Sequence, residues 1–229
     1  HANLVPWQLL AKKTGAKLRY LPLTKAGELD LSQAERYFTS KTKVVSLTHM
    51  SNVLGSINPI DKISEITKKI DAIFIVDAAQ SVSHIPVDVQ NLGCDFITFS
   101  GHKMLGPTGI GVLCGSLKML ESLPQFLSGG AMIETVTLEN ATWNEVPYKF
   151  EAGTPNYVQA IGLGTAVEYL SNIGMENVQA HEKKLTEYAI EKLKTIPELY
   201  IHGSPGNRGG VISFNLNEIH PQDLSQFLN

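Results

Sequence analysis

The chain has 229 residues, of which 43% are hydrophobic, and its 19 basic and 22 acidic side chains give a formal net charge of −3. This length and composition suit one or two domains with a sizeable core. No basic stripe favours a nucleic-acid partner, and no apolar run approaches the length of about 20 residues that spans a membrane. Two cysteines and no visible secretory signal exclude a disulfide framework, so we expect a cytoplasmic protein.

The first third of the chain predicts helices that alternate with strands. Apolar residues at helical spacing begin near Asn3 and stop at Gly15. The elements expected are a helix over 3–15, a strand over 17–21, a helix over 32–38, a strand over 43–47, a helix from Pro59 and a strand over 73–76. Such alternation favours a mostly parallel sheet with helices on both faces, an α/β fold.

The rest of the chain continues this pattern and then changes character. The expected elements are strands over 95–99 and 109–114, a long ordered loop over 128–148, helices over 157–172 and 176–193, strands over 199–201 and 209–216 joined by a turn over 203–207, and a helical pattern over 221–228. We expect residues 1–150 to form a large domain. Residues 151–229 would supply a domain-linking helix and the start of a smaller α+β domain.

The strongest chemical signal follows the predicted strand that ends at Phe99. Ser100, His102 and Lys103 stand in a glycine-rich loop at the end of that strand, where open α/β sheets bind ligands. A lysine there can form a Schiff base with a carbonyl compound such as pyridoxal phosphate (PLP). The serine hydroxyl and the histidine imidazole could hold the phosphate. By itself the segment fits a solvated surface lysine equally well.

A second polar pair follows the apolar run over 73–76. Asp77 falls at the same edge of the predicted sheet as Lys103. A carboxylate beside a pyridine nitrogen favours its protonated form, which lets the ring withdraw electrons, and Gln80 could hydrogen-bond the ring's phenolic oxygen. A lone Asp after a strand is more often a cap or turn residue. The combination of Asp-x-x-Gln with Ser-x-His-Lys is much more specific than either part.

Five segments together resemble the motifs of class V PLP enzymes: residues 48–55, 77–80, 100–103, 106–111 and 150–156. The match is nearest to the group II, SUF-type cysteine desulfurases, with selenocysteine lyases close by. The match covers the whole chain given but not the full length of the family's proteins. The resemblance implies the aspartate aminotransferase-like fold type I of PLP-dependent transferases, with PLP bound to Lys103.

The resemblance also implies roles for residues that composition leaves ambiguous. In that family Asn52 contacts the cofactor ring or the substrate carboxylate, and Gly153-Thr154 reaches the phosphate of the cofactor in the neighbouring subunit of a homodimer. On composition alone, Ser-Asn-x-x-Gly is an ordinary turn and Asn156 is a helix cap. The implied cofactor-binding residues are Asn52, Asp77, Gln80, Ser100, His102, Lys103 and Thr154.

The cysteines and histidines narrow the chemistry further. Cys94 and Cys114 stand in strand-associated contexts without a charged neighbour that clearly lowers a thiol pKa, so we expect structural roles for both. The seven histidines show no metal-ligand spacing. In the resembling desulfurases, the ring-stacking histidine precedes the position of His1, and the nucleophilic cysteine and a carboxylate-binding arginine follow that of Asn229. We therefore expect a fragment that lacks both ends.

The activity implied by the resemblance is removal of sulfur from L-cysteine, leaving L-alanine. The sulfur would pass to an enzyme cysteine as a persulfide and then to an acceptor protein for iron–sulfur cluster assembly. Selenocysteine lyase or another class V aminotransferase-like activity is an alternative, because these enzymes share the quoted motifs. A non-catalytic scaffold of the same fold is a third hypothesis, against which the retained Lys103, Asp77, Gln80 and His102 argue.

Overall fold

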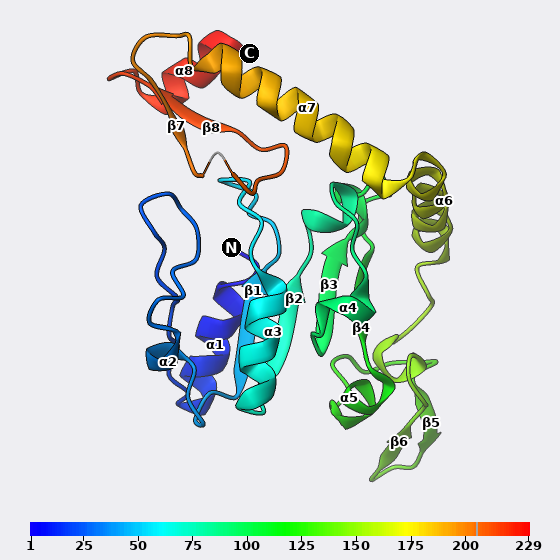
Figure 1. Ribbon diagram of the computed structural model, residues 1–229. Helices are drawn as coiled ribbons and strands as arrows, with labels where there is room; N and C mark the ends of the chain where they lie inside the picture. The colour runs from blue at the N-terminus through cyan, green and yellow to red at the C-terminus, as the bar shows by residue number, and fades with distance from the viewer. Residues whose placement is uncertain (205) are drawn as a thin grey trace.

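The computed structural model describes residues 1–204 and 206–229 and is organised around a four-stranded sheet (Figure 1). The strands lie in the order β1-β2-β3-β4. Strands β1 (Val44–Thr48), β2 (Ile73–Asp77) and β3 (Phe96–Ser100) are parallel, whereas β4 (Gly111–Gly115) pairs antiparallel with β3. The mostly parallel sheet predicted from the sequence is therefore confirmed.

The main core lies on one face of this sheet. The register places Leu47 opposite Val76, and because side chains alternate along a strand, Phe74 points to the same face as Val76. Phe74 and Val76 are fully buried and pack against Ile60 of helix α3 (Ile60–Lys69). The predicted apolar face of the helix that follows Pro59 is thus the face that covers the sheet.

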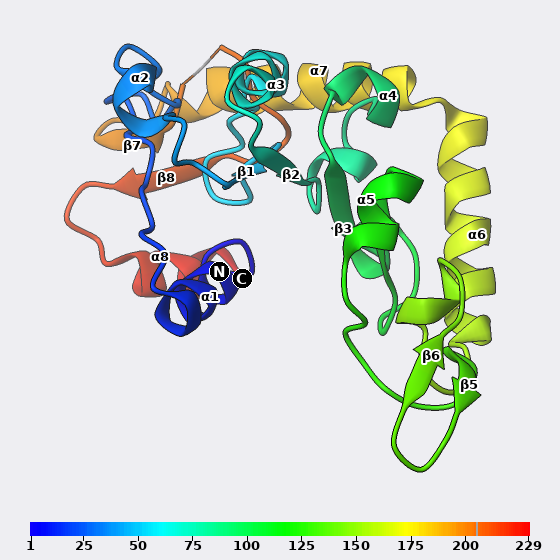
Figure 2. The ribbon, with the colours of Figure 1, turned by 90° about the horizontal axis from the view of Figure 1, so that it is seen from below.

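The opposite face of the sheet meets the start of the chain. The Asn3 side chain hydrogen-bonds the hydroxyls of Ser46 and Thr48, just before helix α1 (Val5–Thr14) begins. Helix α1 ends where Gly15 adopts a φ of 75°, as predicted for its C-terminal stop. Seen from below, α1 and α3 lie on opposite sides of β1 (Figure 2), so helices cover both faces.

Short helical segments lie before β1 and in the connections that follow later strands. They are α2 (Ala34–Tyr37), η1 (Ser81–Ser83), α4 (Val89–Leu92), η2 (Gly101–Lys103), α5 (Leu117–Ser122) and η3 (Tyr148–Phe150). Helix α2 is shorter than the predicted 32–38, because the chain turns extended at Phe38 and buries that side chain in the main core.

The later part of the chain contains two long helices and a small sheet. Helix α6 (Tyr157–Ile173) lies along one side of the molecule. After a turn at Gly174, α7 (Met175–Leu193) runs across the molecule toward the last two strands (Figure 1). Beyond α7 lie the antiparallel pair β7 (Leu199–His202) and β8 (Ser213–Leu216), and helix α8 (Pro221–Leu228). Among the described residues, no helix has the length and apolar character needed to cross a bilayer. The division into domains at residue 150 stays a prediction.

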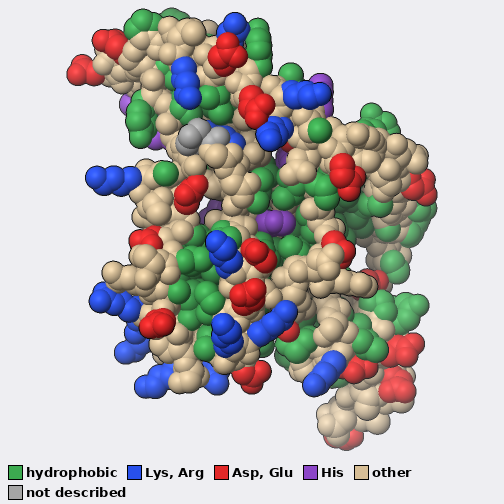
Figure 3. Space-filling view, viewed as in Figure 1, with side chains coloured by type: hydrophobic (Ala, Val, Ile, Leu, Met, Phe, Trp, Pro, Cys, Tyr) green, Lys and Arg blue, Asp and Glu red, His purple; other side chains and the backbone are tan. Residues whose placement is uncertain are grey.

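Apolar side chains remain on the outside of α6. Tyr157, Val158 and Ile161 are each more than 60% exposed, and the space-filling view shows apolar side chains among the charged ones on that side of the molecule (Figure 3). Exposed apolar clusters of this kind often mark protein–protein contacts.

Two expectations about strands are wrong. Residues 17–21 form no strand, because no neighbouring strand in the described part of the chain pairs with them and only Leu21 packs on the core. Residues 128–148 are not a loop throughout, since they contain a hairpin of β5 (Ile133–Val136) and β6 (Ala141–Trp143). The hairpin escaped detection because most of its side chains are exposed and its hydrogen-bonded Thr135–Thr142 pair is polar.

The predicted strand over 209–216 is only half right. Strand β8 begins at Ser213, and the preceding residues instead cross to the loop that follows β1, where Arg208 forms an antiparallel bridge with Ser56. The turn predicted over 203–207 includes Pro205, which lies outside the described residues.

Candidate active site

The polar residues singled out in the sequence follow three neighbouring parallel strands. Asn52 comes after β1, Asp77 ends β2, and Lys103 follows β3 in η2. The register pairs Thr48 with Asp77 and Asp77 with Thr98. The carboxyl ends of these strands therefore meet at one edge of the sheet, which is where open α/β sheets bind ligands.

Asp77 is held by its own turn. Its Oδ1 accepts a hydrogen bond from the Ala79 backbone N–H at 3.1 Å, and its backbone carbonyl accepts one from the His49 N–H at 2.8 Å. Among the described residues, Oδ2 has no hydrogen-bond partner. The carboxylate is thus fixed in place with one oxygen available to a ligand.

The loop that carries Lys103 is closed by its own backbone. The Gly101 N–H donates to the Ile110 carbonyl and the Gly106 N–H donates to the Gly101 carbonyl, both at 2.9 Å. A Cβ on Gly106 would lie 2.9 Å from that same Gly101 oxygen, so the turn leaves no room for a side chain. His102 and Lys103 project from this closed loop and are exposed.

Helix α6 packs against the Lys103 loop from outside. Met104 is buried with Leu163 and Leu170 of α6. The Asn156 Nδ2 donates to the Gly109 carbonyl at 2.7 Å and makes no capping bond to α6. Asn156 therefore stands at the N-cap position of α6 as expected, but its side-chain amide ties the start of α6 to the glycine loop and does not cap the helix.

The loop after β1 presents Asn52 to solvent. Ser51 organises this loop, since its Oγ accepts bonds from the Val53 and Leu54 backbone N–H groups at 3.2 and 3.1 Å. The Asn52 side chain is exposed and has no hydrogen bond within the described residues. Its amide can therefore donate to or accept from a ligand.

The remaining predicted residues differ in their placement. Gln80 and Ser100 are half-buried at the ends of β2 and β3, and their side-chain polar atoms have no hydrogen-bond partner in the described chain. Thr154 is exposed beside Gly153, whose φ is 86°. No hydrogen bond of the described residues joins Thr154 to Lys103 or Asp77. The structure brings the others to one edge and leaves Thr154 on the surface before α6.

Two polar residues near the site, one buried and one half-buried, carried no signal in the sequence. His49 is only 7% exposed, its Nδ1 has no partner among the described residues, and burial lowers the pKa of its ring. Burial also lowers the pKa of the Arg208 guanidinium, which hydrogen-bonds the loop of Asn52 from a point 154 residues away in the chain. A single arginine between a predicted turn and a predicted strand gives no indication of such a contact.

The cysteines agree with their predicted structural roles. Cys94 and Cys114 are free, half-buried and packed against the main core. Burial raises the pKa of the Cys94 thiol, which disfavours the reactive thiolate. The described residues contain no cluster of three or more potential metal ligands.

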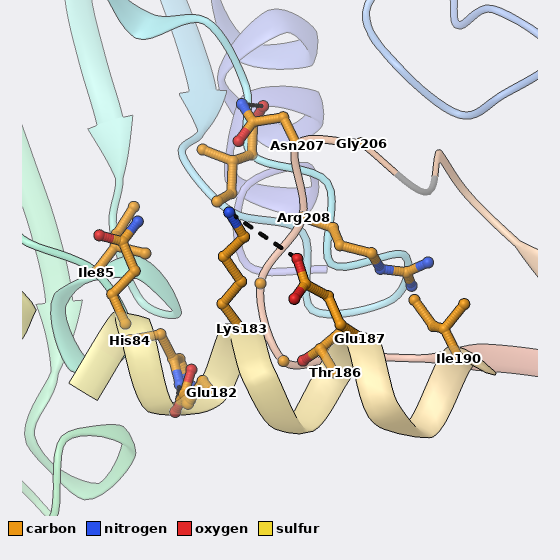
Figure 4. A pocket seen from close by; sticks show the side chains of 14 residues that line it. His84, Ile85, Glu182, Lys183, Thr186, Glu187, Ile190, Gly206, Asn207 and Arg208 are labelled. Atoms are coloured by element: carbon orange, nitrogen blue, oxygen red, sulfur yellow. Dashed lines mark hydrogen bonds and ion pairs between the residues drawn. The ribbon is translucent and has the colours of Figure 1, made fainter. Parts of the chain in front are cut away.

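A pocket lies apart from this edge, between α7 and the segment over 206–210 (Figure 4). His84, just after η1, lines it and pairs through Nδ1 with the Glu182 Oε1 at 2.7 Å. None of the predicted site residues line this pocket. This pocket lies between α7 and residues 206–210 and is therefore not the candidate active site.

Comparison with known proteins shows which family the chain belongs to. The family model described as aminotransferase class-V matches residues 1–229. The chain is 52% identical to a probable cysteine desulfurase of Streptomyces coelicolor and 49% identical to a cysteine desulfurase of Haloferax volcanii. All of this chain is covered in both matches, but only 55% and 54% of the relatives. The chain thus spans about half the length of the curated relatives it matches.

Solved structures agree with these relatives. The apo structure of a cysteine desulfurase from Thermococcus onnurineus NA1 superposes with a TM-score of 0.95 at 41% identity. The S-sulfonic acid form of the cysteine desulfurase CsdA from Escherichia coli gives 0.95 at 35% identity. Each match covers 100% of this chain and 57% of the other. The expected fold, type I of the PLP-dependent transferases, is therefore confirmed.

Proposed function

Because the chain belongs to the aminotransferase class-V family, we propose that the protein containing it is a cysteine desulfurase that binds PLP through Lys103. The observation that carries this proposal is the meeting of Lys103, Asp77 and Asn52 at the carboxyl ends of three neighbouring parallel strands. Relatives named cysteine desulfurase, which are 52% and 49% identical in sequence to this chain, support the choice of reaction.

The free groups at this edge fit PLP. The cofactor needs a primary amine for its aldehyde, a carboxylate for its pyridine nitrogen and donors for its phosphate and phenolic oxygen. The exposed Lys103 amine, the unpartnered Oδ2 of Asp77 and the Gln80 amide match these needs. The Ser100 hydroxyl and the His102 ring are available as phosphate donors.

When bound, PLP supplies an electron sink that stabilises negative charge at the substrate α-carbon. The Lys103 amine would remove and return the α-proton of the substrate as a general base and acid. The Asp77 carboxylate would favour the protonated form of the pyridine nitrogen. Asn52 orients the ring or the substrate carboxylate with its free amide.

We propose L-cysteine as the substrate and L-alanine as the product. The substrate C–S bond breaks as a thiolate attacks the sulfur, which leaves that thiol as a persulfide, and protonation of the carbon completes alanine. Neither described cysteine suits the attack, because both pack against the core and burial raises the pKa of Cys94. The nucleophile is therefore proposed to lie outside residues 1–229. Transfer to an acceptor protein for iron–sulfur assembly, and a cytoplasmic location, remain predictions.

We also propose a homodimer in which Thr154 reaches the partner's cofactor phosphate. The support is the exposed apolar start of α6, formed by Tyr157, Val158 and Ile161 directly after Thr154. Mixing an inactive Lys103→Ala protein with an impaired Thr154→Ala protein should restore activity, because each heterodimer has one intact site. Mixed protein no more active than its two components would contradict the shared site.

The central assignment is tested in the whole protein with Lys103→Ala. We expect loss of the yellow absorbance, of the borohydride-reducible linkage and of alanine production. Lys118→Ala is the matched control, because Lys118 is an exposed lysine of α5 away from the site. A Lys103→Ala protein that keeps a borohydride-reducible linkage would show that another lysine holds the cofactor.

A further inference from the structure

The loop that presents Asn52 is paired with a distant segment, residues 207–211, which we name the bridging segment. The Ile57 N–H donates to the Asn207 carbonyl at 3.1 Å, and the Gly209 N–H donates to the Gly55 carbonyl at 2.9 Å. Arg208, between them, bridges Ser56 in antiparallel fashion. The bridging segment therefore acts as a short strand against the second half of the Asn52 loop.

Arg208 fastens this pairing with its side chain. Its Nη2 donates to the Leu54 carbonyl at 3.0 Å and to the Val211 carbonyl at 2.6 Å. The Nε is buried and has no partner among the described residues. A half-buried guanidinium is costly unless its donors find acceptors. Both of these bonds come from the single nitrogen Nη2, and Nη1 donates to the Ser204 carbonyl at 3.5 Å. Arg208 thus holds the Leu54 and Val211 carbonyls together through one nitrogen.

The fit between loop and bridging segment is close enough to exclude side chains. Gly55 has a φ of 72°, and a Cβ there would lie 2.7 Å from the Val211 carbonyl oxygen. A Cβ on Gly209 would clash with the Cε and Sδ of Met50, which is completely buried. Met50 and Gly55 flank Asn52 in the chain. The bridging segment is therefore in direct contact with the loop on both sides of Asn52.

Asn52 itself makes no hydrogen bond in the described chain, so its position depends on the backbone that carries it. We propose that Arg208 is a positioning residue for Asn52: by binding Leu54 it fixes the loop that presents the Asn52 amide to the substrate or cofactor. This inference rests on the proposed function. Because the bridging segment leads into β8, it also connects the position of the β7–β8 sheet to the active site.

A double-mutant cycle in the whole enzyme tests whether Arg208 acts through Asn52. The variants are Arg208→Met, Asn52→Ala and the double variant, and the readouts are kcat and KM for L-cysteine. Arg208→Met should lower kcat/KM on the order of tenfold in the native background, as expected for loss of a charged hydrogen bond. In the Asn52→Ala background the further loss should be less than about twofold. Losses that multiply would overturn the inference.

Amide hydrogen exchange on the cofactor-free protein gives a second readout, independent of activity. Exchange at residues 51–57 should become faster in Arg208→Met and stay unchanged in Arg19→Met. Arg19 is a matched control, because its guanidinium also donates to a backbone carbonyl, that of Arg36, but at the exposed surface. Unchanged exchange at 51–57 in Arg208→Met would equally overturn the inference.

Two further outcomes are distinguishable. If Arg208→Met does not fold, Arg208→Lys takes its place in the same cycle, since it keeps the charge and loses only the fork. If the native protein shows neither a reducible linkage at Lys103 nor alanine production, the proposed function fails before the cycle begins. A yellow, active enzyme whose losses multiply refutes the role of Arg208 alone.

Discussion

The loop of Lys103 and the loop of Asn52 follow strands of the same sheet but are stabilised in different ways. The Lys103 loop closes on itself, with backbone bonds among Gly101, Gly106 and Ile110. The Asn52 loop takes much of its support from the bridging segment, about 150 residues later in the chain. A loop whose contacts are local has its shape encoded in its own residues. A loop held from a distance is shaped only when the rest of the chain has folded.

Asp77 ends β2, the strand between the two that carry these loops. A substitution of Asp77 tests whether the two loops form one site. Asp77→Asn should retain the cofactor but lower kcat by about 100-fold, because a neutral amide no longer favours the protonated pyridine nitrogen. Absorbance reports cofactor retention, and alanine production reports turnover. Asp88→Asn is a control of the same chemistry away from the site, at the N-terminus of α4. Undiminished turnover in Asp77→Asn at saturating PLP would remove Asp77 from the site.

Added methyl groups should separate the two kinds of loop in stability. Gly55→Ala combines a φ of 72° with a contact of 2.7 Å to a backbone oxygen, so we expect it to lower the free energy of unfolding by about 2–4 kcal/mol. Gly106→Ala has the close contact without the unusual φ and should cost about 1–3 kcal/mol. Denaturant titration measures both.

Gly164→Ala is the control for these substitutions. Its added Cβ would meet nothing within 4 Å, and it lies within α6, so it should stabilise the protein by about 0.5–1 kcal/mol. If Gly55→Ala were as well tolerated as Gly164→Ala, the tight contact between the Asn52 loop and the bridging segment would be wrong.

Asn156 joins the Lys103 loop to α6 and sharpens the comparison, because it gives that loop a hydrogen bond from farther along the chain, beside the packing of Met104 on α6. Asn156→Ala removes a 2.7 Å bond to the Gly109 carbonyl and should cost about 1 kcal/mol. Asn177→Ala removes a similar 2.7 Å bond, to the Ile173 carbonyl, and should cost a similar amount. Hydrogen exchange in the Lys103 loop should rise only in Asn156→Ala. Equal exchange in both variants would show that the loop does not need the Asn156 bond.

The smallest expected effect is on pH dependence next to the Asn52 loop. Burial lowers the pKa of His49 below the ordinary histidine value of about 6.5, so the folded state keeps this ring neutral where the unfolded state already binds a proton. Stability is therefore full above about pH 6.5 and falls as the pH drops toward the folded pKa. His49→Leu should reduce this fall between about pH 6.5 and 5, measured by denaturant titration at each pH. An unchanged pH profile would show that His49 is not its source.

The sequence alone determined the elements whose signals are local. The apolar runs of β1, β2 and β3 fixed the sheet, and helical periodicity with Pro59 and Gly15 located α3 and α1. Asp77 and Lys103 could be placed at one edge because the carboxyl ends of parallel strands meet there. Residues at short spacing in the chain are necessarily close in space, so pattern and turn chemistry suffice for them.

Only the tertiary structure decided the features that depend on a distant partner. The extended residues 17–21 lack a neighbouring strand, the hairpin of β5 and β6 depends on pairing between polar strands, and Asn156 binds Gly109 where a cap bond was expected. Arg208 belongs to the same group, since its acceptor Leu54 lies 154 residues earlier in the chain. Hydrogen bonds between remote segments leave no periodic trace in the sequence, because either partner alone has the composition of an ordinary turn.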